Sequence, residues 1–136
     1  MIVFADTSAL FALLVRDDAM HMHAKEAFAR LAEQSAHLLT SSYVLVENTA
    51  LLQRRIGLKA VHDFNARIVP LLEVVWADAD WHARAVHRLL AQTDRAVSLV
   101  DCLSFEIMEA RGISTAYTFD KHFDEEGFRL IPSRTP

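Results

Sequence analysis

The sequence predicts an α/β protein in which helices cover both faces of a mostly parallel sheet. Short apolar segments rich in β-branched residues alternate along the chain with longer segments whose apolar residues recur at helical spacing. The 136 residues suit one compact domain over 1–136, and a hydrophobic content of 52% supplies a sizeable core. This composition excludes an intrinsically disordered chain, which would combine low hydrophobicity with a large net charge.

The chain opens with a strand followed by two helices. Residues 1–5 form a short apolar segment that is typical of a buried parallel strand. Thr7 or Ser8 is placed to cap the next helix, whose helical spacing of apolar residues stops at Asp17. A second helix is expected over about 21–34, because alanine, phenylalanine and leucine there fall on one face.

The middle of the chain repeats the strand and helix alternation. A second strand is expected over 37–40, and Ser41 or Ser42 is placed to cap a helix that continues through Arg55 and ends at Gly57.

A further helix is expected from Leu58 until Pro70 closes it. Residues 71–76 are β-branched and apolar, which favours a third strand, and Asp78 or Asp80 begins the helix after it.

The last third begins with a capping-box spacing. Ser98 and Asp101 are three residues apart at the start of an apolar helical segment, and Gly112 is placed to end that helix. Two more strands are expected over 114–119 and 128–131. The final residues, 132–136, are expected to form a frayed tail.

Four acidic residues occupy positions where such a fold gathers functional groups. Asp6 and Asp120 each follow a strand, and ligands of open α/β sheets bind beyond the carboxyl ends of strands. Asp101 lies in the first turn of its helix, and Glu47 interrupts an apolar helical stripe together with Asn48. Each position also has a structural explanation, as a helix or turn cap or as the edge of a stripe. Their joint arrangement favours a site.

Carboxylates gathered at one point repel one another unless a divalent cation lies between them. A site made only of oxygen ligands suits Mg²⁺ or Mn²⁺ rather than zinc. Such an ion lowers the pKa of a bound water and stabilises in-line displacement at phosphorus. The sequence therefore predicts a Mg²⁺ or Mn²⁺ site that joins Asp6, Glu47, Asp101 and Asp120.

Four stretches of sequence extend this pattern over nearly the whole chain: VFADTS at 3–8, SYVLVE at 42–47, SLVDCLS at 98–104 and YTFDKHF at 117–123. In their order and spacing they resemble the PIN-domain family and, within it, the VapC-type toxins of bacterial toxin–antitoxin pairs. The resemblance implies a three-layer α/β/α sandwich with a mostly parallel sheet of four or five strands, often in a homodimer. It also implies metal-dependent cleavage of RNA phosphodiester bonds and a cognate VapB-type antitoxin as partner.

The resemblance also implies roles for individual residues. Asp6 and Asp101 match the principal metal ligands, and Glu47 and Asp120 match the residues that complete the site directly or through water. Three further residues are implied to support the site, the last as a reserve for Asp120: Thr7, Ser98 and Asp124.

The net charge and the cysteine content disfavour or exclude several other classes of protein. The formal net charge of −4 disfavours a module that holds nucleic acid by charge alone, but an acidic nuclease site can bind metal and reverse its local charge. The single cysteine, Cys102, excludes an internal disulfide framework. No targeting segment is visible and no apolar segment approaches the length of a membrane span, so a cytoplasmic protein with no membrane partner is expected.

Two other functions remain open at this point. The first is a PIN-fold interaction module that has lost activity, against which the complete set of four acidic residues argues. The second is a phosphoaspartate phosphotransfer or receiver protein, although Ser8 stands where such a phosphatase carries a second Asp and Lys121 directly follows Asp120. Of the seven histidines, most are expected at the surface or in caps, and His122 is notable only because it is near Asp120.

Overall fold

A computed structural model describes residues 1–133 as a five-stranded sheet in the order β3-β2-β1-β4-β5, with every neighbouring pair parallel. The strands are β1 (Ile2–Ala5), β2 (His37–Ser41), β3 (Leu72–Val75), β4 (Thr115–Tyr117) and β5 (Arg129–Ile131). The α-helices are α1 (Thr7–Leu14), α2 (His21–Glu33), α3 (Ser42–Arg55), α4 (Leu58–Asp63), α5 (Ala79–Leu90), α6 (Leu99–Arg111) and α7 (Lys121–Glu125). None of the helices in this part of the chain has the length and apolarity needed to cross a membrane.

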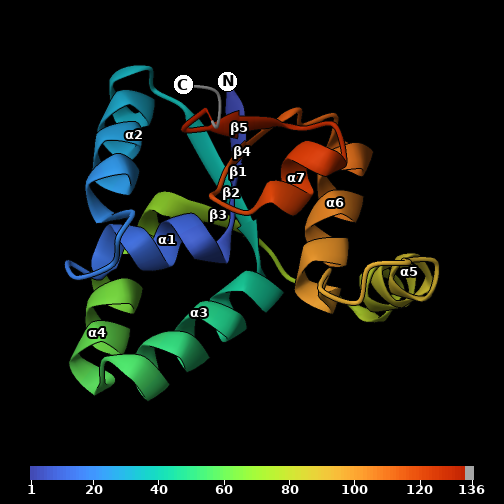
Figure 1. The fold of residues 1–136 in the computed structure, drawn as a ribbon, viewed down its shortest axis with the longest axis horizontal. Helices are drawn as coiled ribbons and strands as arrows, with labels where there is room; N and C mark the ends of the chain where they lie inside the picture. Colours follow the sequence, from blue (N-terminus) through green and yellow to red (C-terminus); the bar gives the residue numbers. More distant parts are fainter. Residues whose placement is uncertain (134–136) are drawn as a thin grey trace.

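Helices cover both faces of the sheet, as the sequence predicts. Helices α1 and α2 lie on one side of the strands and α5, α6 and α7 lie on the other, while α3 runs across below the carboxyl ends of the strands (Figure 1). Strand β1 is central and its last three residues, 3–5, are fully buried. The carboxyl end of β1 therefore faces the space in which α1 and α6 begin and across which α3 passes (Figure 1).

The helix caps decide where several of these elements begin. Ser41 caps α3 and Asp78 caps α5, in each case by accepting a backbone N–H bond from the first turn. The cap of α1 is Asp6, so the prediction of Thr7 or Ser8 is wrong. The reason is that the chain leaves its extended conformation one residue earlier, and the Asp6 carboxylate accepts the bond from the Ser8 backbone.

The structure differs from the sequence-based expectation at three other places. The strand expected over 114–119 ends at Tyr117, and the helix that begins at Leu58 becomes π-helical at Phe64. Residues 121–125 form the short helix α7, which the spacing of apolar residues does not indicate. Of the predicted tail 132–136, residues 134–136 lie outside the described part of the chain.

An aromatic cluster fixes α6 against α7. The fully buried ring of Phe105 contacts Phe123 at 4.9 Å and Phe128 at 5.9 Å between ring centroids. The guanidinium of Arg88 lies over the same ring at 5.1 Å and also pairs with Glu126, at the end of α7, at 2.8 Å. Because α6 carries Asp101 and α7 begins after Asp120, this cluster sets the distance between two of the predicted site residues.

We expect Phe105→Ala to lower the free energy of unfolding by about 3–5 kcal/mol, because it leaves a cavity beside the rings of Phe123 and Phe128. Urea unfolding measures the change. Phe105→Leu keeps most of the buried volume and should cost clearly less. Equal losses for the two variants would contradict the packing role given to this ring.

Candidate active site

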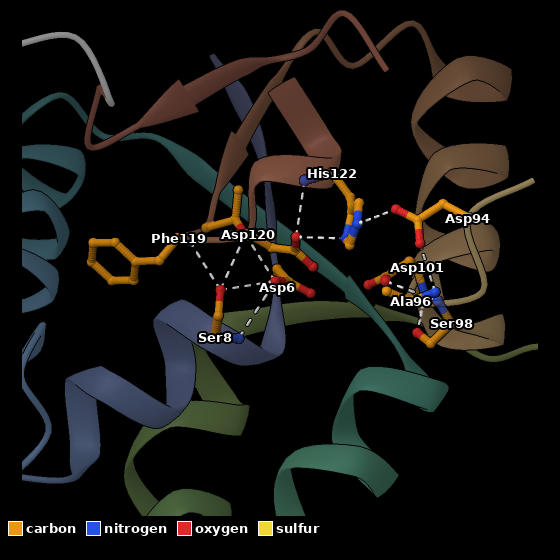
Figure 2. Close-up of polar contacts among 10 residues, drawn as sticks. Asp6, Ser8, Asp94, Ala96, Ser98, Asp101, Phe119, Asp120 and His122 are labelled. Atoms are coloured by element: carbon orange, nitrogen blue, oxygen red, sulfur yellow. Dashed lines mark hydrogen bonds and ion pairs between the residues drawn. The ribbon is translucent and has the colours of Figure 1, made fainter. Parts of the chain in front are cut away.

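Three aspartates meet at the carboxyl edge of the sheet, each at the start of a helix. Asp6 follows β1 and caps α1, Asp120 follows β4 and caps α7, and Asp101 lies in the first turn of α6. Strands β1 and β4 are parallel neighbours, so the residues that follow them emerge side by side. Figure 2 shows Asp6 next to Asp120, with Asp101 facing them from α6.

Two hydroxyl groups hold the Asp6 carboxylate. Its Oδ2 accepts hydrogen bonds from the hydroxyls of Thr118 at 2.8 Å and Ser8 at 2.9 Å. The same hydroxyls accept backbone N–H bonds from Phe119 and Asp120, so the segment after β4 is tied to the start of α1 (Figure 2). Asp6 is therefore positioned by groups that also position Asp120.

Asp101 is held by the predicted capping box. The Ser98 hydroxyl accepts a bond from the Asp101 backbone, and the Ser98 backbone N–H donates to Oδ2 of Asp101, each at 3.1 Å. These two bonds form the capping box that the spacing of Ser98 and Asp101 predicts. The second carboxylate oxygen of Asp101 receives no hydrogen bond among those described for residues 1–133.

Glu47 approaches the aspartates from α3. Its side chain is half-buried, and its charge is close enough to raise the pKa of Asp101. Its neighbour Asn48 is fully buried, and the amide oxygen and nitrogen of Asn48 have no hydrogen-bond partner within the described residues.

His122 lies between Asp120 and Asp94, which belongs to the loop before α6 (Figure 2). The imidazole is buried, with Nε2 hydrogen-bonded to Asp94 at 3.2 Å and Nδ1 2.9 Å from Oδ1 of Asp120. Burial lowers the pKa of His122, but the Asp120 charge and the Asp94 hydrogen bond outweigh it, so the pKa lies above its ordinary value.

Burial and mutual repulsion make the carboxylates costly to ionise. Burial, with the Asp101 charge added to it, raises the pKa of Asp6 to about 7. Burial is also the main cause that raises the pKa of Asp101 to about 6, and the charges of Asp120 and Glu47 add to it. A positive charge among these groups would remove much of that cost.

The donor set fits a divalent cation. Asp6 and Asp101 each use only Oδ2 for the hydrogen bonds described in residues 1–133, which leaves the other oxygen of each for a ligand role. One ligand atom each from Asp101, Asp120 and His122 lies within 4.8 Å of the other two. Several carboxylate oxygens at one point are the ligands that Mg²⁺ and Mn²⁺ take.

Some predicted supporting residues do not take part. The Thr7 hydroxyl is buried but has no hydrogen-bond partner in residues 1–133, and Ser8 and Thr118 support Asp6 instead. Asp124 is exposed and lines a separate hollow beside Arg30, so the structure does not bring it to the other aspartates. Asp120 therefore remains the fourth acidic residue in our account.

Sequence reasoning missed four participants. Three of them contact a predicted aspartate directly, and the fourth, Asp94, contacts one of those three, His122. The four are Ser8, Asp94, Thr118 and His122. For His122 the available indication was its place two residues after a strand-end Asp, where a new helix turns its side chain back toward the sheet.

Comparison with known proteins identifies the family. The family model described as the PIN domain matches residues 3–128. The chain belongs to the PIN-domain family. It is 36% identical over 127 residues to the 23S rRNA-specific endonuclease VapC20 of Mycobacterium tuberculosis, in strains CDC 1551/Oshkosh and H37Rv, covering 93% of this chain and 95% of the relative.

A solved structure extends the similarity to three dimensions. The crystal structure of Mycobacterium tuberculosis VapC20, described as a sarcin–ricin loop cleaving toxin, matches with a TM-score of 0.81. The match covers 94% of this chain and 96% of that one, at 36% identity. The predicted fold, a PIN-like three-layer α/β/α sandwich with a mostly parallel sheet of four or five strands, is confirmed, and the sheet has five strands.

We expect the metal-free PIN domain to lose stability as the pH rises from about 4 to about 7. The unfolded Asp6 and Asp101 side chains have ordinary pKa values near 3.8, whereas the folded values are about 7 and about 6. The folded state therefore binds more protons within that window, so raising the pH favours unfolding until both groups are ionised. Thermal unfolding in a chelator at several pH values measures this dependence.

Asp6→Asn is the matched control for that series. It removes the charge and keeps the shape, so its metal-free unfolding temperature should exceed that of the wild type at pH 8 and vary less with pH. A wild-type protein that is more stable at pH 8 than at pH 5 in chelator would contradict the electrostatic account.

Proposed function

We propose that this chain is a divalent-metal-dependent endoribonuclease, the toxin of a VapBC-type toxin–antitoxin pair. The observation that carries the proposal is the meeting of Asp6, Asp101 and Asp120 at the carboxyl edge of the sheet in a PIN-domain chain. Similarity to VapC20 over nearly the whole length of both chains supports endonuclease activity. Such a protein would act in the cytoplasm, where RNA is abundant.

The residues present give each part of the site a role. Asp6 and Asp101 would hold Mg²⁺ or Mn²⁺, with Glu47 and Asp120 completing the set directly or through water. When bound, the metal supplies a water of lowered pKa and a positive charge for the scissile phosphate. The hydrogen bonds from Ser8 and Thr118 to Asp6, and from the Ser98 backbone to Asp101, keep the ligand oxygens in place before substrate arrives.

The substrate that the comparisons support first is ribosomal RNA. The relative is named a 23S rRNA-specific endonuclease, and its crystal structure is described as that of a sarcin–ricin loop cleaving toxin. We propose that this chain also cleaves 23S rRNA. A catalytically silent PIN-fold module is the alternative, and it predicts no RNA fragments at all.

A hollow away from the aspartates offers a docking surface for an antitoxin. It has a volume of about 680 Å³ and lies among α1, α2, α4 and the π-helical segment that follows α4. Its apolar and basic lining residues include Leu13, Phe28, Ile68, Arg16, Lys25 and Arg67. No ion pair described for residues 1–133 engages these three basic side chains.

We propose that the antitoxin lays an amphipathic segment with acidic side chains into this basic hollow. Apolar side chains of the antitoxin would cover the floor of the hollow, and its carboxylates would pair with the basic rim.

On the family resemblance we also propose that the chain forms a homodimer, and light scattering measures its oligomeric state.

Asp6→Asn should reduce RNA cleavage by about a hundredfold or more, the size of loss that follows removal of one group that stabilises a transition state. The assay incubates purified ribosomes with protein and Mn²⁺ and maps the 23S rRNA ends. Asp124→Asn is the matched control, because it makes the same change at an exposed carboxylate outside the cluster. Wild-type cleavage by D6N, or equal loss in D124N, would contradict the site assignment.

The double variant Lys25→Glu, Arg67→Glu should weaken binding of the co-expressed antitoxin by about tenfold or more, because two attractive rim charges become repulsive. Its RNA cleavage should stay at the wild-type rate. Arg30→Glu, on the other hollow, is the control, and it reverses one basic charge where the double variant reverses two. Unchanged antitoxin affinity in the double variant would exclude the basic hollow as the docking surface.

A further inference from the structure

His122 presents two ring nitrogens to different acidic groups. Nε2 is hydrogen-bonded to Oδ2 of Asp94 at 3.2 Å, and Nδ1 faces Asp120 and Asp101 at the centre of the site (Figure 2). The residue is 8% exposed, so neither nitrogen is freely hydrated.

The contact with Asp94 decides where the ring carries its hydrogen. An ionised carboxylate only accepts hydrogen bonds, so Nε2 must be the donor to Asp94. In a neutral imidazole the other nitrogen, Nδ1, then carries a lone pair. That lone pair is directed into the cluster of carboxylates.

Nδ1 is buried beside the Asp120 carboxylate without a hydrogen bond. It lies 2.9 Å from Oδ1 of Asp120, but the direction of the ring does not give a hydrogen bond, and Nδ1 has no other hydrogen-bond partner within residues 1–133. A lone pair this close to a carboxylate oxygen is repelled, so Nδ1 either carries a proton and forms an ion pair with Asp120 or binds a metal ion in place of that proton. One ligand atom each from His122, Asp120 and Asp101 already lies within 4.8 Å of the other two.

We propose that His122 Nδ1 is a nitrogen ligand of the catalytic metal, oriented by the Nε2 hydrogen bond to Asp94. The inference rests on the proposed metal-dependent function and adds a ligand to it. A histidine that binds metal through one nitrogen and donates the other N–H to a carboxylate is a recurring arrangement, because the carboxylate fixes the tautomer and the ring direction.

A metal site with nitrogen and oxygen ligands prefers different ions from a site with oxygen ligands alone. Imidazole nitrogen contributes more to binding a transition ion than to binding Mg²⁺, which prefers oxygen. The site formed by Asp101, Asp120 and His122 should therefore discriminate in favour of Mn²⁺ over Mg²⁺. Loss of the imidazole should reduce that preference.

The direct test is electron spin-echo spectroscopy of the wild-type protein with one equivalent of Mn²⁺. We expect the spectrum to show coupling to an imidazole nitrogen and to change when histidine is labelled with ¹⁵N. This measurement needs no variant, so it does not depend on whether a substituted protein folds. Bound Mn²⁺ without nitrogen coupling would overturn the proposal.

Two variants test whether the nitrogen that couples to Mn²⁺ is Nδ1 of His122. His122→Asn should abolish the coupling and weaken Mn²⁺ binding by about tenfold or more in calorimetry, with a smaller change for Mg²⁺. Asp94→Asn should keep the coupling but weaken Mn²⁺ binding, since the ring loses its orienting partner.

Glu125 supplies the matched control, because Asp94, His122 and Glu125 form a second group of ligand atoms on the outer side of the ring. Coupling that survives Glu125→Gln and disappears in Asp101→Asn supports the inner site. The reverse pattern would place the ion outside and overturn the proposal. Asp6-dependent RNA cleavage without nitrogen coupling would leave the proposed function standing, whereas absence of Mn²⁺ binding would contradict both.

Discussion

Repulsion among buried carboxylates is the constraint on which the site depends. Asp6 and Asp101 are both nearly excluded from solvent, at 3% and 7% exposure, and each raises the cost of ionising its neighbours. Two such groups are expensive to bury without a cation or protons. The fold nevertheless holds these two carboxylates close together, as expected if a positively charged ligand binds between them.

The fold meets this constraint by making the beginnings of helices converge. Asp6 caps α1, Asp101 completes the capping box of α6 and Asp120 caps α7. Each aspartate therefore satisfies backbone N–H groups with one oxygen, and the positive end of a helix favours its negative charge. The parallel order of β1 and β4 brings two of these helix starts to one edge, and the ring of Phe105 fixes α6 against α7. Structural and functional explanations of these residues are thus compatible.

The sequence alone predicted the parts of the site that local patterns determine. Asp6 and Asp120 follow strands, and Asp101 completes a capping box, so chain position indicated where they would lie. The hydroxyl of Thr118 on Asp6 joins residues 112 positions apart, and the bond from His122 to Asp94 joins residues 28 positions apart. Such contacts depend on which strands are neighbours and on side-chain direction, neither of which one sequence displays.

The central claim is that this edge of the sheet holds a catalytic divalent ion, and crystals grown with Mn²⁺ test it most directly. Anomalous X-ray diffraction would locate the ion without reference to any assay. The account predicts an anomalous peak among the carboxylates of Asp6, Asp101 and Asp120, and no such peak in crystals of Asp6→Asn with Asp101→Asn. A wild-type crystal whose Mn²⁺ lies elsewhere, with these carboxylates unliganded, would contradict it.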